Sequence, residues 1–425
     1  MISKHKAPSL QTDLTPEQIE NRHASETKTA DLLITLLFAG ILFFFAVLIY
    51  LLPQREYSEQ ENRYLQQFPK ASSQSSGPVW ERIQNGTFLD RFFSGKFTSE
   101  INTFYADQFP FRDFFVGVRG AAEIALMKGE NNGILFAADS YLIERFDSPD
   151  TEGLSAKLEM LSSFAGVLSE NGIPLTLAAA PRTIDAMESK LPVLFDINPV
   201  HAPWDTLLSY ENTIDILNLR DPLREAAASG DYVMYRTDHH WTTRGAYLAY
   251  AELMRHFGGE PLPPEAFDIQ TVSDDFYGTS WSSAGLKWIE PDTIEWYRFE
   301  GDETDFETRI SDSGEVYNGF YDTSYLEGKD QYSAFLSGNP ACLEIRQLSP
   351  SEPRQKLLLL KDSFANALAP FLARHYDLVL IDLRYYRQSV AEFIRENDID
   401  RVVVLYNMDS LLTSLDFPKL TIGLN

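Results

Sequence analysis

The chain has 425 residues, which is enough to bury one large hydrophobic core or two smaller ones. Hydrophobic residues make up 44% of it and aromatic residues 13%, a composition typical of a folded body and not of a disordered chain. The formal charge of −26 disfavours nucleic acid and anionic lipid surfaces as partners, because both are bound through Lys and Arg. With one cysteine, Cys342, the chain cannot form an intrachain disulfide or a paired-cysteine metal site.

The first fifty residues predict a membrane anchor. Residues 32–52 read LLITLLFAGILFFFAVLIYLL, an uncharged run long enough to cross roughly 30 Å of hydrocarbon as a helix. The run ends at Pro53 without an Ala-x-Ala cleavage site, so we expect an uncleaved anchor and not a signal peptide; a buried core helix is the alternative. Basic residues flank both ends about equally, and we expect the large acidic body to lie outside and residues 1–31 to form a flexible cytoplasmic tail.

A polar spacer and an aromatic helical stretch are predicted next. Residues 53–79 are rich in Ser, Gln, Gly, Pro and charge, as linkers are. From Val79 to about Leu126, large apolar residues recur at helical spacing. We expect most of these apolar residues to be core: Phe88, Phe92, Phe93, Phe97, Ile101, Phe104 and Tyr105.

From about Asn132 the sequence alternates between short apolar runs and helical patterns, which predicts an α/β body. The runs and patterns comprise a hairpin at 134–136 and 141–143, a helix at 154–168, strands at 174–180 and 213–219, and a helix at 246–257. Residues 260–345 are richer in Asp, Gly, Ser, Tyr and Trp, and we expect a β-rich insertion or long loops there. Such a segment either shapes a substrate groove or only fills space.

The C-terminal quarter gives the clearest pattern. Strands are predicted at 357–360, 378–383 and 401–406, and the helices between them at 365–376 and 389–396. Strands that alternate with single helices form parallel sheets with right-handed crossovers. The predicted fold class is therefore α/β with a central parallel sheet.

Two short motifs supply the groups that make a serine nucleophilic. They are Asp238-His239-His240-Trp241 and Lys361-Asp362-Ser363-Phe364. An imidazole can take the proton of a serine hydroxyl, and a carboxylate fixes the imidazole's tautomer and steadies its charge. Ser363 follows a strand and precedes a helix, a position where ligands bind in open α/β sheets and where backbone N–H groups face a developing oxyanion. A simple helix N-cap is the alternative for this serine.

The first motif allows more than one interpretation. In extended backbone, Asp238 and His240 share one face and His239 points to the other. Histidines that only stabilise the fold are one alternative, and a metal site is another. Zinc needs three or four ligands, and the chain has neither an HExxH motif nor a cysteine pair, so we expect no metal. It also lacks a glycine-rich phosphate loop, and we expect no cofactor.

Four further segments occur along the chain in the order that a known family shows. They are Tyr57-Ser58-Glu59-Gln60-Glu61-Asn62-Arg63, Asp107-Gln108-Phe109-Pro110-Phe111-Arg112, Pro181-Arg182, and the segment 332–339, YSAFLSGN. Together with the two motifs, they resemble the DHHW protein family and its relatives, the alginate O-acetyltransferases of the SGNH-hydrolase superfamily. The resemblance covers most of the chain after the anchor. It departs from the pattern at Lys361, where the family has glycine, and in the missing glycines near Arg384 and Leu405.

The resemblance implies an SGNH-hydrolase-like α/β/α sandwich over residues 80–425, with a central parallel sheet, a permuted motif order and a β-rich insertion near 260–345. It implies Ser363 as nucleophile, His240 as base and Asp238 as the residue that orients the base. Candidates for oxyanion or substrate contacts are Asn407, Arg384 and Asn366.

The implied function is that of a membrane-anchored, extracytoplasmic O-acetyltransferase, which acts on a cell-surface polysaccharide through an acyl-enzyme. A multi-pass membrane-bound O-acyltransferase is the implied partner. Two alternatives stay open. One is a carbohydrate esterase with water as acceptor. The other is a non-catalytic glycan-binding protein of the envelope, which the missing glycines and a group of aromatic residues favour. These aromatic residues either stack on sugars or pack in the core: Tyr277, Trp281, Trp288, Trp296 and Tyr297.

Overall fold

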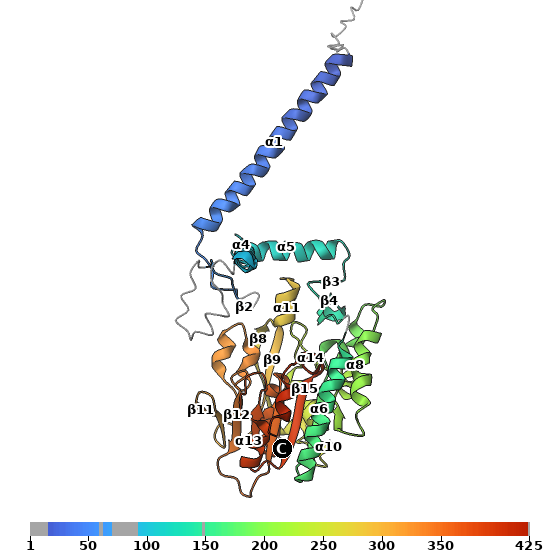
Figure 1. The fold of residues 1–425 in the computed structure, drawn as a ribbon, viewed down its shortest axis with the longest axis vertical. Coiled ribbons are helices and arrows are strands. Elements are labelled where there is room, and N and C mark those ends of the chain that lie inside the picture. Colours follow the sequence, from blue (N-terminus) through green and yellow to red (C-terminus); the bar gives the residue numbers. More distant parts are fainter. Residues whose placement is uncertain (1–15, 59–62, 70–91, 147–148, 424–425) are drawn as a thin grey trace, which may run out of the picture. The chain divides into compact units, whose positions relative to one another are not determined.

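The computed structural model describes residues 16–58, 63–69, 92–146 and 149–423, with side chains from residue 27 on (Figure 1). The chain divides into two compact units. The first comprises residues 1–58 and 63–115, and the second comprises residues 59–62 and 116–425.

The first unit contains the predicted anchor. Helix α1 (Pro16–Leu51) includes a segment, Thr27–Leu51, that is long and apolar enough to cross a membrane. The side chains of this segment are largely exposed, so the structure gives it no protein core to pack in. The helix starts before the apolar run, and the tail predicted as flexible is helical from Pro16 onward; residues 1–15 lie outside the described residues.

The aromatic stretch is helical over most of its described part, as predicted, but the burial of its side chains differs from the prediction. It is divided into α4 (Lys96–Asp107) and α5 (Arg112–Ala125), because Pro110 and the positive φ of Phe111 (59°) interrupt the helix. Phe104 is buried, but Phe92 and Phe93 are 51% and 81% exposed, so the prediction that most of these residues are core is wrong among the described ones. Helical spacing predicts a common face and does not say what covers it. Phe88 and most of the predicted spacer lie outside the described residues.

Short strands complete this region of the chain. Strand β1 (Tyr57–Ser58) pairs with β2 (Arg63–Tyr64). The guanidinium of Arg63 binds the buried carboxylate of Asp107 at 2.6 Å, which ties β2 to the end of α4. Burial raises the pKa of the Asp107 carboxyl, but the hydrogen bond from Arg63 is the larger effect and lowers the pKa below its ordinary value.

The second unit is built on one eight-stranded sheet. Its order is β11-β10-β12-β14-β13-β15-β6-β7. Five neighbouring strands, β14 to β7 in that order, are parallel, and β12, β10 and β11 are antiparallel. The bounds are β6 Leu175–Ala180, β7 Asp215–Asn218, β10 Phe306–Ile310, β11 Val316–Asn318, β12 Cys342–Gln347, β13 Lys356–Lys361, β14 Asp377–Ile381 and β15 Arg401–Asn407. The fold is therefore mixed α/β with a large, mostly parallel sheet.

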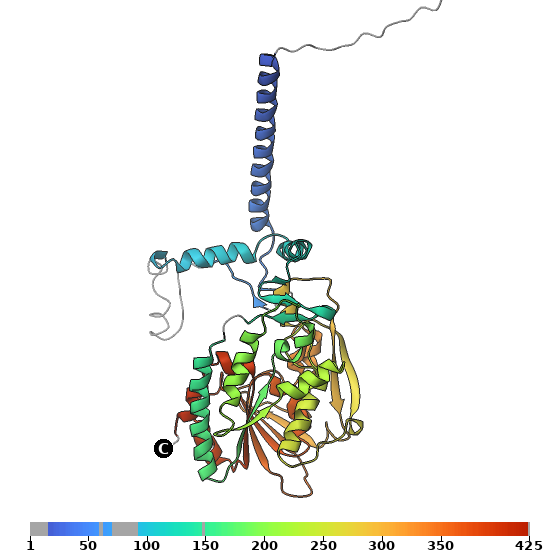
Figure 2. The same cartoon turned by 90° about the vertical axis from the view of Figure 1, so that its right-hand side faces the viewer.

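Both faces of this sheet are covered. Successive leucines of β13 belong to different clusters, because side chains alternate along a strand: Leu357 and Leu359 pack with α10 and α12, and Leu358 and Leu360 pack with α6, α13 and α14. Figure 2 shows the green helices of residues 151–256 along the twisted sheet. The bounds are α6 Thr151–Glu170, α7 Thr183–Ala186, α8 Asn198–Leu208, α9 Arg220–Ala228, α10 Thr243–His256, α11 Thr279–Ala284, α12 Phe364–Leu372, α13 Val390–Glu396 and α14 Met408–Thr413.

Most predicted elements of the body are confirmed. The predicted hairpin is β4 (Ile134–Phe136) paired with β5 (Leu142–Glu144), and β3 (Glu130–Asn131) adds a third strand. The helices and strands of the C-terminal quarter lie where the sequence places them, although α12 ends at Leu372 and not at residue 376. Short 3-10 turns lie at Ala138–Ser140, Glu188–Lys190, Pro264–Ala266, Thr323–Glu327, Gln331–Ala334 and Phe417–Thr421.

The segment 260–345 is β-rich, as expected, and part of it joins the main sheet. Strands β8 (Asp268–Phe276) and β9 (Asp292–Arg298) form their own pair, whereas β10, β11 and the start of β12 extend the main sheet. Its aromatic residues divide into two groups: Trp296 and Tyr297 are buried core residues, and Trp288 is 52% exposed. This segment also carries the helix α11 and the turn Gln331–Ala334 to the predicted site.

Candidate active site

Ser363 lies at the carboxyl edge of the parallel strands, between β13 and α12. The capping role belongs to its neighbour: Asp362 Oδ1 accepts from the Phe364 N–H at 2.9 Å, and Oδ2 accepts from the Asn407 N–H of β15 at 2.8 Å. The Ser363 hydroxyl makes no capping bond to α12. Because Asp362 fixes the turn, the serine hydroxyl is available for another partner.

That partner is His240. Its Nε2 lies 2.7 Å from Ser363 Oγ, and its Nδ1 lies 2.6 Å from Asp238 Oδ1. Asp238 and His240 are 2% and 6% exposed, so water does not compete strongly for these bonds. The structure thus brings together the carboxylate, imidazole and hydroxyl that the sequence singled out, from segments 123 residues apart.

From the sequence we expected an extended backbone for the first motif, but the structure has a bend there. In this tight bend the His240 N–H donates to Asp238 Oδ1 at 3.0 Å. The rings of His239 and His240 therefore do not point to opposite faces but lie beside each other, with centroids 3.9 Å apart. His239 Nδ1 contacts Thr279 Oγ1 at 2.7 Å, and no hydrogen bond links it to Ser363 among the described residues.

The Asp238 carboxylate is held ionised. Burial raises its pKa, but the charges of His239 and His240 and the bonds from His240 and the Thr279 N–H outweigh burial and hold the pKa well below its ordinary value. Thr279 donates to Oδ2 through its N–H at 2.9 Å and its hydroxyl at 3.2 Å. An ionised carboxylate on Nδ1 leaves Nε2 of His240 to accept the serine proton.

Two residues without a predicted role hold this arrangement. Tyr332 stacks on His240 with ring centroids 3.8 Å apart and an angle of 11°, and its hydroxyl donates to the Ser363 carbonyl at 3.3 Å. Thr279, described above, carries no local sequence signal because it lies 41 residues from Asp238. Tyr332 belongs to the YSAFLSGN segment, so the family resemblance pointed to its neighbourhood and not to its stacking role.

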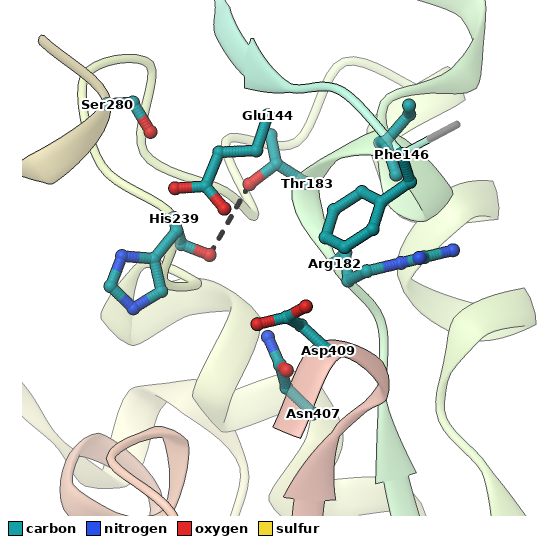
Figure 3. A pocket seen from close by; sticks show the side chains of 9 residues that line it. Glu144, Phe146, Arg182, Thr183, His239, Ser280, Asn407 and Asp409 are labelled. Atoms are coloured by element: carbon teal, nitrogen blue, oxygen red, sulfur yellow. Dashed lines mark hydrogen bonds between the residues drawn. The ribbon is translucent and has the colours of Figure 1, made fainter. Parts of the chain in front are cut away.

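Asn407, a predicted oxyanion candidate, lies at the end of β15 and is 5% exposed. Its Oδ1 accepts from the Ser410 N–H at 2.9 Å and caps α14. This bond directs the amide nitrogen toward a pocket beside the bend (Figure 3). The side chain is therefore oriented as an N–H donor.

The other two candidates are engaged elsewhere. Arg384 forms a two-pronged ion pair with Asp382, with Nη2–Oδ2 at 2.6 Å and Nε–Oδ1 at 2.9 Å. Asn366 is 1% exposed; its Oδ1 accepts from Lys361 Nζ at 2.7 Å and its Nδ2 donates to the Gly338 carbonyl at 2.9 Å. Both atoms of this amide are thus used within the protein.

Lys361, which stands where the family resemblance predicts glycine, is buried and directs its Nζ to Asn366 Oδ1 at 2.7 Å. Its Nζ also donates to Asn339 Oδ1 at 2.9 Å, so it ties the YSAFLSGN segment to α12. The residue is 1% exposed, and burial lowers the pKa of its ammonium to about 8. Lys361 therefore forms a polar link between the YSAFLSGN segment and the helix that follows Ser363.

A small pocket is lined in part by His239. Figure 3 shows its walls and the bond of 3.4 Å from Thr183 Oγ1 to the His239 carbonyl. The cavity measures about 20 Å³, close to the space that one water molecule needs. Its lining consists of Glu144, Phe146, Arg182, Thr183, Ile184, His239, Ser280, Asn407 and Asp409.

The bend also has the spacing of a metal site. Ligand atoms of Asp238, His239 and His240 lie within 4.8 Å of one another. Both ring nitrogens of His240 are, however, used in the bonds to Asp238 and Ser363, and His239 Nδ1 contacts Thr279. This donor set fits a hydrogen-bonded chain to a serine better than a shared metal ion.

Comparison with known proteins supports the family resemblance. Residues 222–382 match the model of the DHHW protein family. The matched segment includes both motifs, so the DHHW resemblance read from the sequence is confirmed. The probable alginate O-acetylase AlgJ of Pseudomonas fluorescens is 24% identical over 171 residues. That match covers 38% of this chain and 43% of AlgJ, so the chain matches less than half the length of this curated relative.

Solved structures show the same fold. A DHHW family protein of Eubacterium siraeum aligns with a TM-score of 0.56 and 19% identity, over 69% of this chain and 96% of that chain. PatB1 of Bacillus cereus, described with a sulfonyl adduct, aligns with a TM-score of 0.53 and 18% identity, over 66% of this chain and 98% of that chain. At these identities the likeness shows the mixed α/β architecture.

Proposed function

We propose that this protein is a membrane-anchored O-acyltransferase that transfers an acetyl group to a hydroxyl of a cell-surface polysaccharide. The observation that carries the proposal is the unbroken chain from Asp238 Oδ1 through His240 to Ser363 Oγ, with bonds of 2.6 Å and 2.7 Å. The similarity to a protein named as a probable alginate O-acetylase supports the acetyl group and the polysaccharide.

In the first half-reaction, Ser363 Oγ attacks the carbonyl carbon of the acyl donor while His240 Nε2 takes the hydroxyl proton. The tetrahedral intermediate collapses, the leaving group departs with the proton from Nε2, and an ester on Ser363 remains. In the second half-reaction, His240 takes a proton from a sugar hydroxyl, whose oxygen attacks this ester. Collapse returns the proton to Ser363 and releases the acetylated sugar.

The surrounding residues would serve this sequence in different ways. Asp238 stays ionised and stabilises the imidazolium that forms in each half-reaction. Asn407, whose amide N–H faces the pocket, is the proposed oxyanion donor together with the Ser363 N–H. Tyr332 keeps the imidazole plane fixed by stacking, so the distance to Ser363 does not depend on substrate.

The anchor and the partner complete the proposal. Thr27–Leu51 would span the membrane and hold the body outside the cytoplasm, close to the envelope glycan. A multi-pass membrane-bound O-acyltransferase would export the acyl group and pass it to Ser363. The donor itself would then never need to cross the membrane as a free ester.

The test is covalent labelling of the full chain in nanodiscs. With p-nitrophenyl acetate we expect one acetyl adduct, and with phenylmethylsulfonyl fluoride one sulfonyl adduct, both mapped to Ser363 by mass spectrometry. Ser363→Ala should lose both adducts, and the control Ser169→Ala, at an exposed serine of α6, should keep them. Ser363→Ala protein that still acetylates an oligosaccharide would refute the proposal. Release of acetate without acetylated sugar would identify an esterase.

A further inference from the structure

The pocket beside His239 contains two carboxylates that the proposed reaction does not use. Glu144, from β5, and Asp409, from α14, are both half-buried and line the same small cavity (Figure 3). Within the described part of the chain, neither carboxylate accepts a hydrogen bond. Burial raises the pKa of both groups, as expected for carboxylates that lack partners.

A third group in the pocket also lacks a partner. Ser280, on α11, is 1% exposed, and its hydroxyl makes no hydrogen bond to any described residue. Figure 3 shows this hydroxyl directed into the pocket, on the side of the Glu144 carboxylate. Because buried hydroxyls are normally hydrogen-bonded, this hydroxyl is available to a ligand group that enters the pocket.

Burial raises the pKa of the Asp409 carboxyl more than the charge of the nearest cation, Arg182, lowers it. Arg182 is held by both oxygens of Asp185 at 2.8 Å, and its guanidinium lies over the ring of Phe146. In Figure 3 this guanidinium points away from the two carboxylates. The pocket therefore combines two carboxylates with the Ser280 hydroxyl and the amide N–H of Asn407.

The pocket adjoins the reacting groups. One wall is His239, whose ring centroid lies 3.9 Å from that of His240. Another is Asn407, whose backbone N–H donates to the carboxylate of Asp362, the residue before Ser363. Ser363 is not among the lining residues, so Glu144 and Asp409 would contact a neighbouring part of the acceptor and not its attacking hydroxyl. At about 20 Å³, the cavity admits one small polar substituent and not a whole sugar ring.

We propose that Glu144, Asp409 and Ser280 form an acceptor subsite that binds a hydrogen-bond-donating substituent, a hydroxyl or an ammonium, of a neutral or amino-sugar glycan. This inference rests on the proposed function and narrows its substrate class. A uronate would place a third carboxylate beside Glu144 and Asp409, on a chain whose formal charge is already −26. The acceptor is therefore not a polyuronate such as alginate.

Acyl transfer by the full chain in nanodiscs tests the subsite, with p-nitrophenyl acetate as donor. The acceptors are a cello-oligosaccharide, a chitosan oligosaccharide and an oligomannuronate of equal length. We expect the preferred neutral or amino acceptor to be used at least about tenfold more efficiently than the oligomannuronate. Which of the two is preferred identifies the substituent as hydroxyl or ammonium.

Isosteric variants separate this subsite from the catalytic groups. In the double variant Glu144→Gln, Asp409→Asn, we expect the KM for the preferred acceptor to rise about tenfold and the discrimination against oligomannuronate to shrink. The acylation rate of Ser363 should not change. Ser280→Ala should raise the same KM about threefold. The control Glu159→Gln, at an exposed position of α6, should change neither quantity.

Binding to Ser363→Ala, measured by calorimetry with the same three oligosaccharides, decides the inference even if no transfer is detected. Equal or tighter binding of oligomannuronate, or a double variant with unchanged acceptor preference, would overturn it. Failure of Ser363 to form any adduct would instead count against the proposed acyl-enzyme, while the binding result would still judge the subsite.

Discussion

Two sets of polar side chains lie side by side in this protein and are arranged in opposite ways. In the set Asp238, His240 and Ser363, the bonds of 2.6 Å and 2.7 Å are made within the chain itself. In the neighbouring pocket, the carboxylates of Glu144 and Asp409 lack partners among the described residues. Side chains that already bond to one another are preorganised for a reaction. Polar side chains that line a pocket without partners can instead bind a ligand. We therefore assign the first set to the proposed reaction and the second to the proposed binding of substrate.

The two adjacent histidines offer the sharpest way to break this comparison. His240→Gln should lower acyl transfer by roughly 10²–10⁴-fold, because no other imidazole among the residues with described side chains binds Ser363 Oγ to take its proton. His239→Gln, the matched control, should lower it less than about tenfold, since this ring contacts Thr279 and lines the pocket but makes no hydrogen bond to Ser363 among the described residues. Steady-state kinetics with p-nitrophenyl acetate measure both. Equal losses would show that the two histidines act as one unit.

The carboxylate can be tested through acid stability as well as rate. The pKa of Asp238 is depressed in the folded protein, so its ionised form stabilises the fold above the unfolded value of about 3.9. This stabilisation is lost as the pH falls below that value toward the folded pKa. Asp238→Asn should therefore show a smaller acid-induced fall in the free energy of unfolding, measured by urea titration between about pH 5 and pH 2.5. Identical pH dependence in both proteins would contradict the assignment.

The sequence could predict that Asp238, His240 and Ser363 come together because they lie in two compact motifs next to strongly periodic elements. The four consecutive leucines before Lys361 predict a buried strand, and Ser363 follows directly at its carboxyl end. A short spacing also joins Asp238 to His240, although a bend and not an extended strand brings them together. Local pattern was therefore sufficient for the groups that bond to one another.

The pocket could not be predicted in the same way. Its acidic residues come from β5 and α14, more than 250 positions apart in the chain, and Ser280 comes from a third element. None of these residues stands in a motif, and only the sheet and its connections bring them together. The exposed Phe92 and Phe93 teach the same lesson in reverse, because periodicity predicts a face and not its partner.

Tyr332 tests how far preorganisation depends on stacking. Tyr332→Leu removes the ring that lies 3.8 Å from the imidazole and should lower transfer about tenfold. Tyr332→Phe keeps the ring and loses only the bond to the Ser363 carbonyl, and we expect a two- to threefold effect at most, about 0.5 kcal/mol. Comparison of kcat for the two variants measures the difference. Equal effects would assign the role to the hydroxyl.

Substitution of Lys361 should give the smallest effect on acylation. This residue is hydrogen-bonded, like the first set, but has no part in the proposed reaction. Its folded pKa of about 8 lies below the unfolded value of about 10.4, so the unfolded chain binds more protons between these two pH values. The folded protein loses the Lys361 proton near pH 8, and the unfolded chain loses it near pH 10.4. The contribution of Lys361 to the free energy of unfolding therefore rises with pH between these two values.

Lys361→Met removes that contribution, and the difference in unfolding free energy between the native protein and the variant should change over this pH range alone. Other groups titrate equally in both proteins and cancel. Because Nζ binds Asn339 and Asn366 and has no part in the proposed reaction, the acylation rate of the folded variant should fall less than threefold. A difference that stays flat from pH 8 to 10.4 would mean that Lys361 is ordinarily charged in the core. A large loss of acylation would instead place this residue, which departs from the family's glycine, among the groups that position the nucleophile.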